Sequence, residues 1–310
     1  MKLLQNTLLQ LRTSSRRAAA RLGRRRPSQV RPARLVIRLD DADLSGTLSG
    51  ERAPLARWQA WLVEAIQWLG TTPVTLRAGS LGGDGLTVDL VRFAHRLDCP
   101  TLLACDGAGL DDDAALRLVD AGLSAVRLEV SDDGALAEAA AQALVAARQQ
   151  RRVTLDIEVV LIWQGAADTV APSVLHWVRR VGCDGFRISP PWRAENMPAD
   201  PALLERLLAE AGPLNRTHRG AVPELHAMVA QQDGEPGMAK PRTGRRCPVG
   251  GQRVVLAADG GMWSCPFKVA VPRGGTVAER WEEAGAHLGE IAGCGRACAH
   301  VELAPEPVVR

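Results

Sequence analysis

The sequence has no apolar segment long enough to cross a membrane, and its 310 residues include no tyrosine and only three phenylalanines. A transmembrane helix needs about 18 or more consecutive apolar residues, so we expect no transmembrane segment. The short apolar stretch at residues 3–11 is followed, not preceded, by arginines, which is not the order of a secretory signal. We therefore expect a cytoplasmic protein in a reducing environment.

Acidic residues are missing from the first part of the chain. Residues 1–38 contain 11 lysines or arginines and no acid, although the net charge of the whole chain is only +3. The remaining residues hold 27 basic and 35 acidic side chains, which gives the body a net charge near −8. Residues 1–33 are therefore predicted to be a flexible basic arm, with docking on a partner as the alternative. Because the body is acidic, the arm alone is weak evidence for a nucleic-acid partner.

From residue 34 onward, apolar strand-like segments alternate with amphipathic helical segments. Strands are expected at residues 33–40, 73–79, 100–105, 125–131, 153–162 and 184–190. Helices are expected at residues 52–69, 86–97, 111–121, 167–181 and 200–211, together with an alanine-rich helix that ends at Gln149. Six strand–helix units predict an α/β fold whose parallel sheet is closed or partly closed into a TIM-like barrel. Ligands of such folds bind beyond the carboxyl ends of the strands.

The composition changes after the last of these units. Residues 214–246 are rich in proline, glycine and arginine, which is typical of a linker. The segment QRVVLAADGGMWSC (252–265) joins an apolar strand, an Asp-Gly-Gly turn and a short second strand, and this order predicts a β-hairpin. We therefore divide the chain into a basic arm at 1–33, a barrel at 34–213, a linker at 214–246 and a small cysteine-rich domain at 247–310.

Four of the seven cysteines lie in that last domain, and we expect them to bind metal: Cys247, Cys265, Cys294 and Cys298. In a reducing environment, clustered cysteines bind metal more often than they form disulfides. A hairpin can hold two thiolates close together, and a compact Cys-x3-Cys turn can add two more. Four thiolates suit either a 4Fe–4S cluster or a tetrahedral zinc ion, and the ligand type does not separate the two. We interpret His300 as a surface residue or a neighbour of the site rather than a ligand.

The other three cysteines, Cys99, Cys105 and Cys183, lie singly at the borders of expected strands. We interpret them as buried small apolar residues. Arg187 and Arg193 lie near the end of the sixth strand, where they can clamp a carboxylate or a peptide backbone, with exposure on the surface as the ordinary alternative. Acidic residues follow the first strand at positions 40, 41 and 43 and can bind a hard cation, although such acids more often cap helices or face solvent.

The order of these parts resembles the radical S-adenosylmethionine (radical SAM) superfamily, in particular its members with a C-terminal SPASM or twitch extension. That family carries Cys-x3-Cys-x2-Cys in the loop after the first strand, where three thiolates bind a 4Fe–4S cluster and SAM takes the open iron. The corresponding loop here is DDADLSGTLSG, with Leu44 at the shared leucine and Ala42, Gly46 and Ser49 at the cysteine positions. None of these three residues is a useful iron ligand. The resemblance therefore implies that the SAM-binding cluster has been lost.

Two further motifs of this family can be compared with the chain. The family has a GGEP motif after the second strand, and the acid of this motif contacts the SAM amino group. The motif falls on residues 78–81 of this chain, which read AGSL and contain no acid. The family's extension begins Cys-x(9–15)-Gly-x4-Cys, and Cys247, Gly260 and Cys265 have this spacing. Full SPASM domains have about seven cysteines and two clusters, so four cysteines suit the single cluster of the twitch form. The resemblance covers roughly residues 34–300.

The resemblance implies a partial (β/α)6 barrel with a SPASM- or twitch-like domain, one auxiliary 4Fe–4S cluster and no cleavage of SAM. Because relatives modify ribosomally made peptides or enzymes, we expect a peptide or protein substrate, or an active radical SAM enzyme as partner. Two alternatives stay open. One is a zinc-stabilised interaction protein, and the other is a barrel enzyme that uses Asp40, Asp41, Ser80 and Asp132 with a divalent metal or a bound metabolite. No catalytic residue is assigned, and binding of SAM without cleavage is left open.

Overall fold

The structure is a computed structural model, and it describes most of the barrel and parts of the C-terminal region. The described residues are 34–39, 53–79, 81, 85–130, 134–162, 167–189, 201–217, 253–257, 262–263 and 276–280. The predicted basic arm, most of the predicted linker and the four clustered cysteines lie outside these ranges. The division of the chain into domains therefore stays a prediction.

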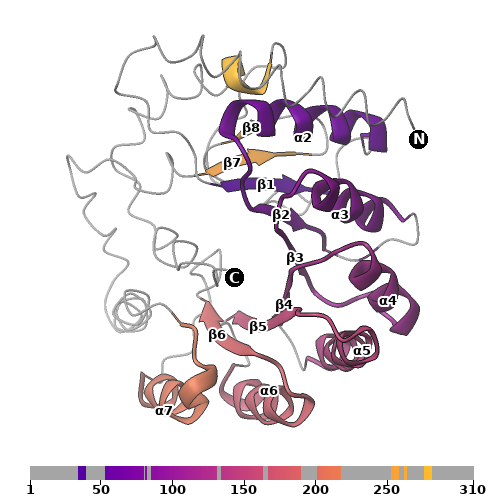
Figure 1. Cartoon of the computed structure of the whole chain (residues 1–310). Helices are drawn as coiled ribbons and strands as arrows, with labels where there is room; N and C mark the ends of the chain where they lie inside the picture. Colours follow the sequence, from indigo (N-terminus) through magenta and orange to yellow (C-terminus); the bar gives the residue numbers. More distant parts are fainter. Residues whose placement is uncertain are drawn as a thin grey trace, which may run out of the picture.

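Six strand–helix units follow one another along the chain, as the sequence predicts (Figure 1). The strands are β1 (Arg34–Arg38), β2 (Val74–Arg77), β3 (Thr101–Cys105), β4 (Ala125–Val130), β5 (Asp156–Ile162) and β6 (Gly185–Ser189). The helices are α2 (Leu55–Leu69), α3 (Leu86–Arg96), α4 (Asp112–Asp120), α5 (Ala135–Arg151), α6 (Ala167–Val181) and α7 (Pro201–Ala211). No helix of the described part is long and apolar enough to span a membrane.

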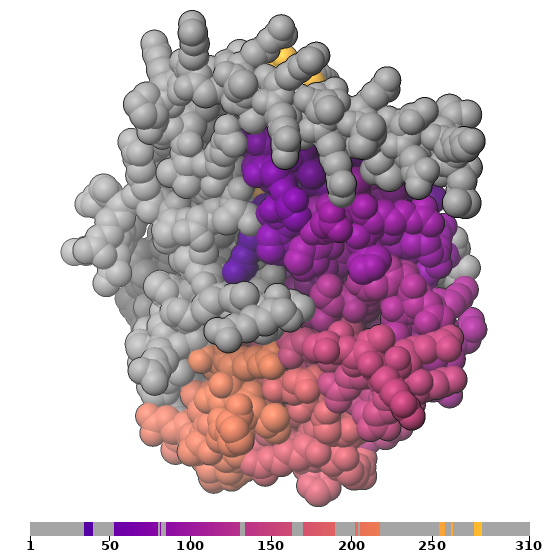
Figure 2. All heavy atoms as spheres, viewed as in Figure 1, coloured from indigo at the N-terminus to yellow at the C-terminus, as the bar shows by residue number. Residues whose placement is uncertain are grey.

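The sheet is an open, partial barrel. Its strand order is β6-β5-β4-β3-β2-β1-β7-β8, and among the described strands β6 and β1 do not pair with each other. Every pair is parallel except β7 (Arg253–Leu256) with β8 (Met262–Trp263). Figure 1 shows the sheet curving, with helices α3 to α6 along its convex side, and Figure 2 shows α7 beside α6. The predicted α/β partial barrel is thus confirmed.

The two faces of the barrel sheet differ in chemistry because side chains alternate along each strand. On the outer face, apolar residues such as Leu35, Ile37 and Leu128 are buried against the helices in one continuous core. On the inner face, the alternating positions of β4 hold Arg127 and Glu129 instead. The core that folds the barrel therefore lies between sheet and helices, whereas the interior is available for polar chemistry.

Local capping explains where one of these helices begins. The carboxylate of Asp111 accepts a hydrogen bond from the backbone N–H of Ala114 at 2.8 Å, which is the usual role of an N-cap aspartate. Asp112 and Asp113 occupy the first turn of α4, where the positive end of the helix dipole favours acids. The run of three acids thus predicts the start of this helix correctly.

The predicted hairpin is present as β7 and β8, and it is attached to the barrel. Val255 pairs with Trp263 and Leu256 with Met262 in antiparallel register. In addition, β7 pairs with β1 in parallel along its whole length, which the sequence did not predict. This pairing covers an edge of β1 that would otherwise expose unpaired backbone groups.

A second segment of the C-terminal region contacts the barrel through α2. Thr276 and Glu279 form a reciprocal capping box, with N–H···O distances of 2.8 and 3.2 Å between them. Glu64 of α2 accepts a third bond from the N–H of Val277 at 3.2 Å, and the Val277 side chain is fully buried. The hairpin and this helical turn both lie next to the first strand–helix unit.

Candidate functional site

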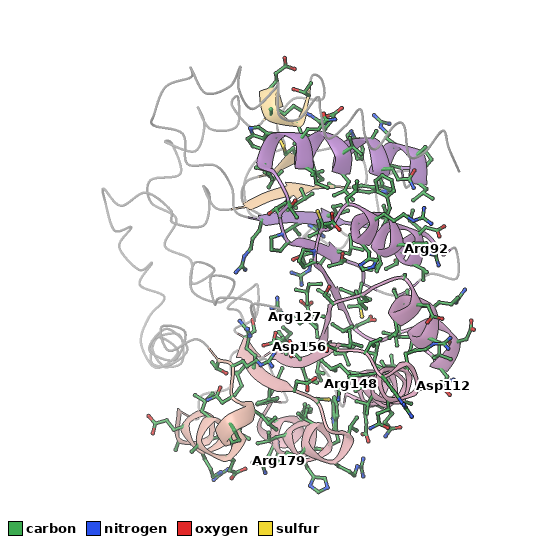
Figure 3. All side chains as sticks on the ribbon, in the orientation of Figure 1. Arg92, Asp112, Arg127, Arg148, Asp156 and Arg179 are labelled. Carbon is green, nitrogen blue, oxygen red and sulfur yellow. The ribbon has the colours of Figure 1, made fainter. Side chains whose placement is uncertain are left out.

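The inner face of the barrel carries ionised side chains. Closed barrels of this class fill the same face with branched apolar residues. The charged residues come from four strands and from the chain after α7: Arg77, Arg127, Glu129, Asp156, Glu158, Arg187 and Arg216. Figure 3 shows Arg127 on the concave side of the sheet, whereas Arg92, Asp112 and Arg179 lie on the outer helices. We take this inner face as the candidate site.

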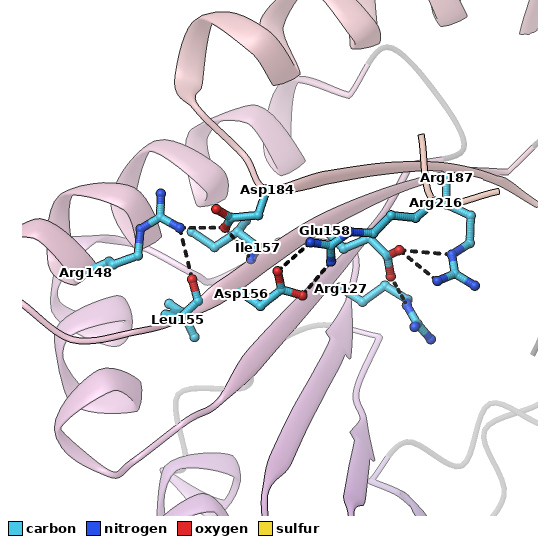
Figure 4. Close-up of polar contacts among 9 residues, drawn as sticks. All are labelled: Arg127, Arg148, Leu155, Asp156, Ile157, Glu158, Asp184, Arg187 and Arg216. Carbon is cyan, nitrogen blue, oxygen red and sulfur yellow. Dashed lines mark hydrogen bonds and ion pairs between the residues drawn. The ribbon is translucent and has the colours of Figure 1, made fainter. Parts of the chain in front are cut away.

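At the centre of the inner face, one carboxylate joins two arginines (Figure 4). Arg127 Nε donates to Glu158 Oε2 at 2.9 Å, and Arg187 donates to Glu158 Oε1 through Nε at 3.0 Å and Nη2 at 2.8 Å. The side chains of Glu158 and Arg187 are only 3% and 6% exposed. The three residues come from β4, β5 and β6, so this cluster ties three neighbouring strands together.

The protonation equilibria of this cluster reflect its burial and its charges. Burial alone would raise the pKa of Glu158, but the Arg127 and Arg187 guanidiniums outweigh it, and the pKa lies below its usual value. The pKa of Arg187 is lowered by burial in the first place and by the charge of Arg127, with Glu158 acting in the opposite direction. The two arginines therefore stabilise the ionised form of Glu158.

A second ion pair lies near the carboxyl ends of the strands. Arg77 Nη2 contacts both carboxylate oxygens of Glu129, at 2.5 and 2.6 Å, and each side chain is about a quarter exposed. The pair connects β2 with β4, so it must pass over β3. The residue in register with both Arg77 and Arg127 on β3 is Ala104, whose small side chain leaves room for this crossing.

A third ion pair lies near the amino end of β5. The guanidinium of Arg216 contacts both carboxylate oxygens of Asp156, at 2.6 and 2.8 Å. Arg216 crosses β6 at Gly185, where an added Cβ would lie only 2.5 Å from its side chain. The hydrogen bond to Asp156 is the main reason that the pKa of Arg216 is raised. A side chain at position 185 would therefore require the Arg216 side chain to shift.

The segment around Arg216 lies along β6. Its N–H donates to the carbonyl of Phe186 at 2.8 Å, and Asn215 and Phe186 form a parallel bridge. The hydroxyl of Thr217 accepts a bond from the N–H of Ile188 at 3.0 Å. The first residues of the predicted linker thus extend the inner face at its β6 side.

A separate polar cluster on the outer side of β5 holds an adjacent helix in place. Arg148 of α5 donates to Asp184 at 2.5 Å and to the carbonyl of Leu155 at 3.0 Å. The same Asp184 oxygen accepts the N–H of Ile157 at 2.9 Å. Figure 4 shows this group apart from the inner-face arginines. It accounts for packing of α5 and does not belong to the candidate site.

The loop positions that the family motifs would occupy are described only in part. Ala42, Gly46 and Ser49 lie outside the described residues, and Ala42 is four positions after the end of β1. After β2, the N–H of Ala78 donates to the carbonyl of Ala104 at 2.9 Å, and the carbonyl of Gly79 accepts a hydrogen bond from the N–H of Asp106 at 3.2 Å. The AGSL segment therefore begins at the carboxyl end of β2, as the comparison with the GGEP motif requires.

The predicted metal ligands are not among the residues that the structure describes. Cys247, Cys265, Cys294, Cys298 and the alternative residues Asp40, Asp41, Asp43, Ser80, Asp132, Arg193 and His300 all lie outside them. Within the described ranges, no group of three or more histidine, cysteine or acidic residues could hold a metal ion. The described hairpin ends at Trp263, two positions before Cys265. The metal site stays a prediction.

The single cysteines behave as predicted. Cys99, Cys105 and Cys183 are buried, with 2–5% of their surface exposed. Burial raises the pKa of all three thiols, to about 12 for Cys105 and Cys183. They are therefore neutral thiols at neutral pH and are poor nucleophiles or metal ligands.

Sequence reasoning found one member of the candidate site and missed the others. Arg187 clamps a carboxylate, as one of the two interpretations predicted, but the carboxylate is that of Glu158 in the same chain. The alternative interpretation, that Arg187 is exposed on the surface, was wrong, because Arg187 is buried. Arg127, Glu129 and Glu158 were missed. A signal for them exists, because charged residues at alternate positions of a strand between helices indicate a polar inner face.

Comparison with solved structures identifies the fold. The structure is similar to SuiB of Streptococcus suis bound to S-adenosylmethionine, with a TM-score of 0.62 and 12% identity over 88% of this chain and 69% of SuiB. It is also similar to anSMEcpe with bound AdoMet, with a TM-score of 0.54 and 13% identity over 82% of this chain and 83% of anSMEcpe. The chain therefore shares the partial-barrel fold of SuiB and anSMEcpe.

This similarity is structural. SuiB bound to its precursor peptide SuiA matches with a TM-score of 0.56 and 12% identity, over 76% of this chain and 60% of SuiB. No protein-family model matches the sequence, and no curated protein matches it. At 12–13% identity, the agreement establishes the fold alone.

Proposed function

We propose that this chain is a radical SAM-like protein that does not cleave SAM and that acts in the modification of a peptide or protein. It serves as a peptide-binding component or as the partner of an active radical SAM enzyme. One observation carries the proposal: a barrel similar to those of SuiB and anSMEcpe is combined with a β1 loop that holds Ala42, Gly46 and Ser49 where the family has thiolates.

The peptide part of the proposal is supported by what the similar proteins bind. SuiB has been solved with its precursor peptide SuiA, and anSMEcpe with the Kp18Cys peptide. In the present chain, the inner face of the barrel carries arginines and carboxylates that can form hydrogen bonds to a peptide. A protein that binds the peptide without reacting with SAM would present it to a second enzyme.

A SAM molecule anchored on a cluster does not fit the residues at the positions of the family motifs. Ala and Gly at positions 42 and 46 have no donor atom, and Ser49 offers only a hydroxyl, which binds iron poorly. The segment at 78–81 has no acid to hold the amino group of SAM. No step of the proposed function therefore passes through SAM.

The C-terminal thiols do fit a metal group. Cys247, Cys265, Cys294 and Cys298 would hold one 4Fe–4S cluster of the auxiliary type, and four thiolates complete its ligand set. A cluster without an open iron supplies electron transfer or structural support, not Lewis-acid chemistry. The same donor set suits zinc, which would make the chain a zinc-stabilised interaction protein.

Reductive cleavage of SAM tests the proposal directly. The chain, purified without oxygen and reconstituted with iron and sulfide, would be incubated with SAM and dithionite, and 5′-deoxyadenosine would be measured. We expect no product above that of a protein-free control. A variant in which Ala42, Gly46 and Ser49 are all replaced by cysteine is the matched comparison. Its cluster content is compared with that of the unmodified chain. Product from the unmodified chain would refute the proposal.

A further inference from the structure

The C-terminal region contacts the barrel at two places, and both lie on the first strand–helix unit. β7 pairs with β1 (Figure 1), and residues 276–280 contact α2. We propose that these segments, the C-terminal strap (β7, β8 and residues 276–280), transmit metal binding at the clustered thiols to β1 and α2. The inference rests on the metal site in the proposed function and adds an effect of the metal on the conformation of the barrel.

The strap is part of the barrel sheet. β7 pairs in parallel with β1 from Arg34↔Arg253 to Ile37↔Leu256. On its other side, β1 pairs in parallel with β2. Since β1 lies between these two strands, the loss of β7 would turn β1 into an edge strand with unpaired backbone groups. Whatever holds β7 in place therefore also protects β1.

Apolar side chains of the strap belong to the same core as the barrel helices. Four of them are buried in that core with no exposed surface: Val254, Leu256, Met262 and Val277. Burial of apolar surface is the dominant favourable contribution to folding. Movement of the strap away from the barrel would expose these side chains to water, so the strap and the first unit stabilise each other.

Glu64 of α2 provides the second contact. Its carboxylate accepts a hydrogen bond from the N–H of Val277 at 3.2 Å, at the start of a helical turn. The first N–H groups of a helix have no partner within the helix, and an acid is favoured beside them. Thr276 and Glu279 cap this turn from within the C-terminal region. Glu64 adds a cap that comes from the barrel.

The proposed metal ligands flank the parts of the strap along the sequence. Cys247 lies six positions before β7, Cys265 lies two positions after β8, and residues 276–280 lie between Cys265 and Cys294. A metal group that joins these cysteines stabilises the arrangement that it binds. Because β7 pairs with β1, this stabilisation reaches the strand that precedes the loop containing Ala42, Gly46 and Ser49.

Hydrogen–deuterium exchange of the full-length chain tests the inference. One half of a preparation made without oxygen keeps its metal, and the other half is treated with a chelator under reducing conditions. Iron and zinc are measured on both halves, and exchange is followed by mass spectrometry of peptides. We expect peptides from β1 and α2 to exchange about tenfold or more slowly with metal, because the metal disfavours local opening. Peptides from β5, which is separated from β1 by three strands, should change less.

Two variants of α2 connect the effect with the strap. Glu64→Ala removes the acceptor for the Val277 N–H and should accelerate exchange in α2 and in residues 276–280 by about tenfold, with the metal content unchanged. Gln67→Ala, at an exposed position of the same helix, is the matched control. Both changes introduce alanine and so have similar effects on helix propensity, but Gln67→Ala should leave exchange unchanged.

Metal-bound protein whose β1 and α2 exchange as fast as in the metal-free protein would overturn the inference and leave the metal site standing. Equal protection of β1 and β5 by metal would also overturn it, because the effect would not follow the strap. The same holds for equal exchange in Glu64→Ala and Gln67→Ala. A chain that holds neither iron nor zinc would refute the metal site in the proposed function, and this inference with it.

Discussion

At the scale of single residues, Glu158 has the most consequences. Its carboxylate is nearly inaccessible to water and is held by guanidiniums from two neighbouring strands. A buried ion pair is not itself strong evidence of stability, because desolvation offsets the attraction. Removal of one member is different, since it leaves the other charges buried and unpaired. The residue therefore matters for folding and for the charge balance of the candidate site.

Glu158→Gln should destabilise the fold by about 3–5 kcal/mol, because Arg127 and Arg187 would lose their shared carboxylate in the interior. Urea denaturation followed by circular dichroism measures the effect. Asp113→Asn is the control, since Asp113 pairs with Arg117 on the exposed side of α4 and should change stability by about 0.5 kcal/mol or less. Similar effects of the two changes would contradict the assigned role.

Acidification should weaken the fold through the same residue. Because the pKa of Glu158 is lowered in the folded state, its contribution is complete above the unfolded value of about 4.3 and is lost as pH falls through the folded value. The urea midpoint of the unmodified chain should therefore fall steeply below about pH 4. In Glu158→Gln this part of the pH dependence should be absent. Parallel pH profiles for the two proteins would refute the assignment.

At the scale of elements, the strand and helix positions could be predicted because local patterns determine them. β4 was expected at 125–131 and lies at Ala125–Val130, and the acids at 111–113 start α4 as expected. The pairing of β7 with β1 could not be predicted, since it joins residues more than 200 positions apart without a local signal. The crossing of Arg77 over Ala104 was missed because it depends on the register of three strands, for which there is no local signal.

Gly185 and Arg216 provide a test at this scale. Gly185 is not among the glycines with positive φ, so only the nearby Arg216 side chain limits a larger residue there. Gly185→Ala should destabilise the chain by about 1–3 kcal/mol, because the added methyl displaces Arg216 from Asp156. In an Arg216→Ala background the same change should cost much less. Additive effects in this double-mutant cycle, measured by urea denaturation, would show that the contact is absent.

At the scale of the whole molecule, the barrel is well defined by the sequence pattern and the candidate site is not. Alternation of strands and helices is enough to predict a partial barrel, and the solved structures confirm that fold. The inner-face ion pairs depend on register between strands, which the pattern of one strand does not contain. The proposed metal ligands, such as Cys265, were selected by spacing and lie outside the described residues, so chemistry must test them.

The metal content of the protein tests the central claim most directly. Iron, acid-labile sulfide and zinc would be measured on the unmodified chain and on Cys265→Ser, both purified without oxygen, with Cys105→Ser as a control outside the proposed ligand set. We predict about four irons per chain, retained in Cys105→Ser and lost in Cys265→Ser. One zinc and no iron would contradict the iron–sulfur assignment and favour the zinc-stabilised interaction protein.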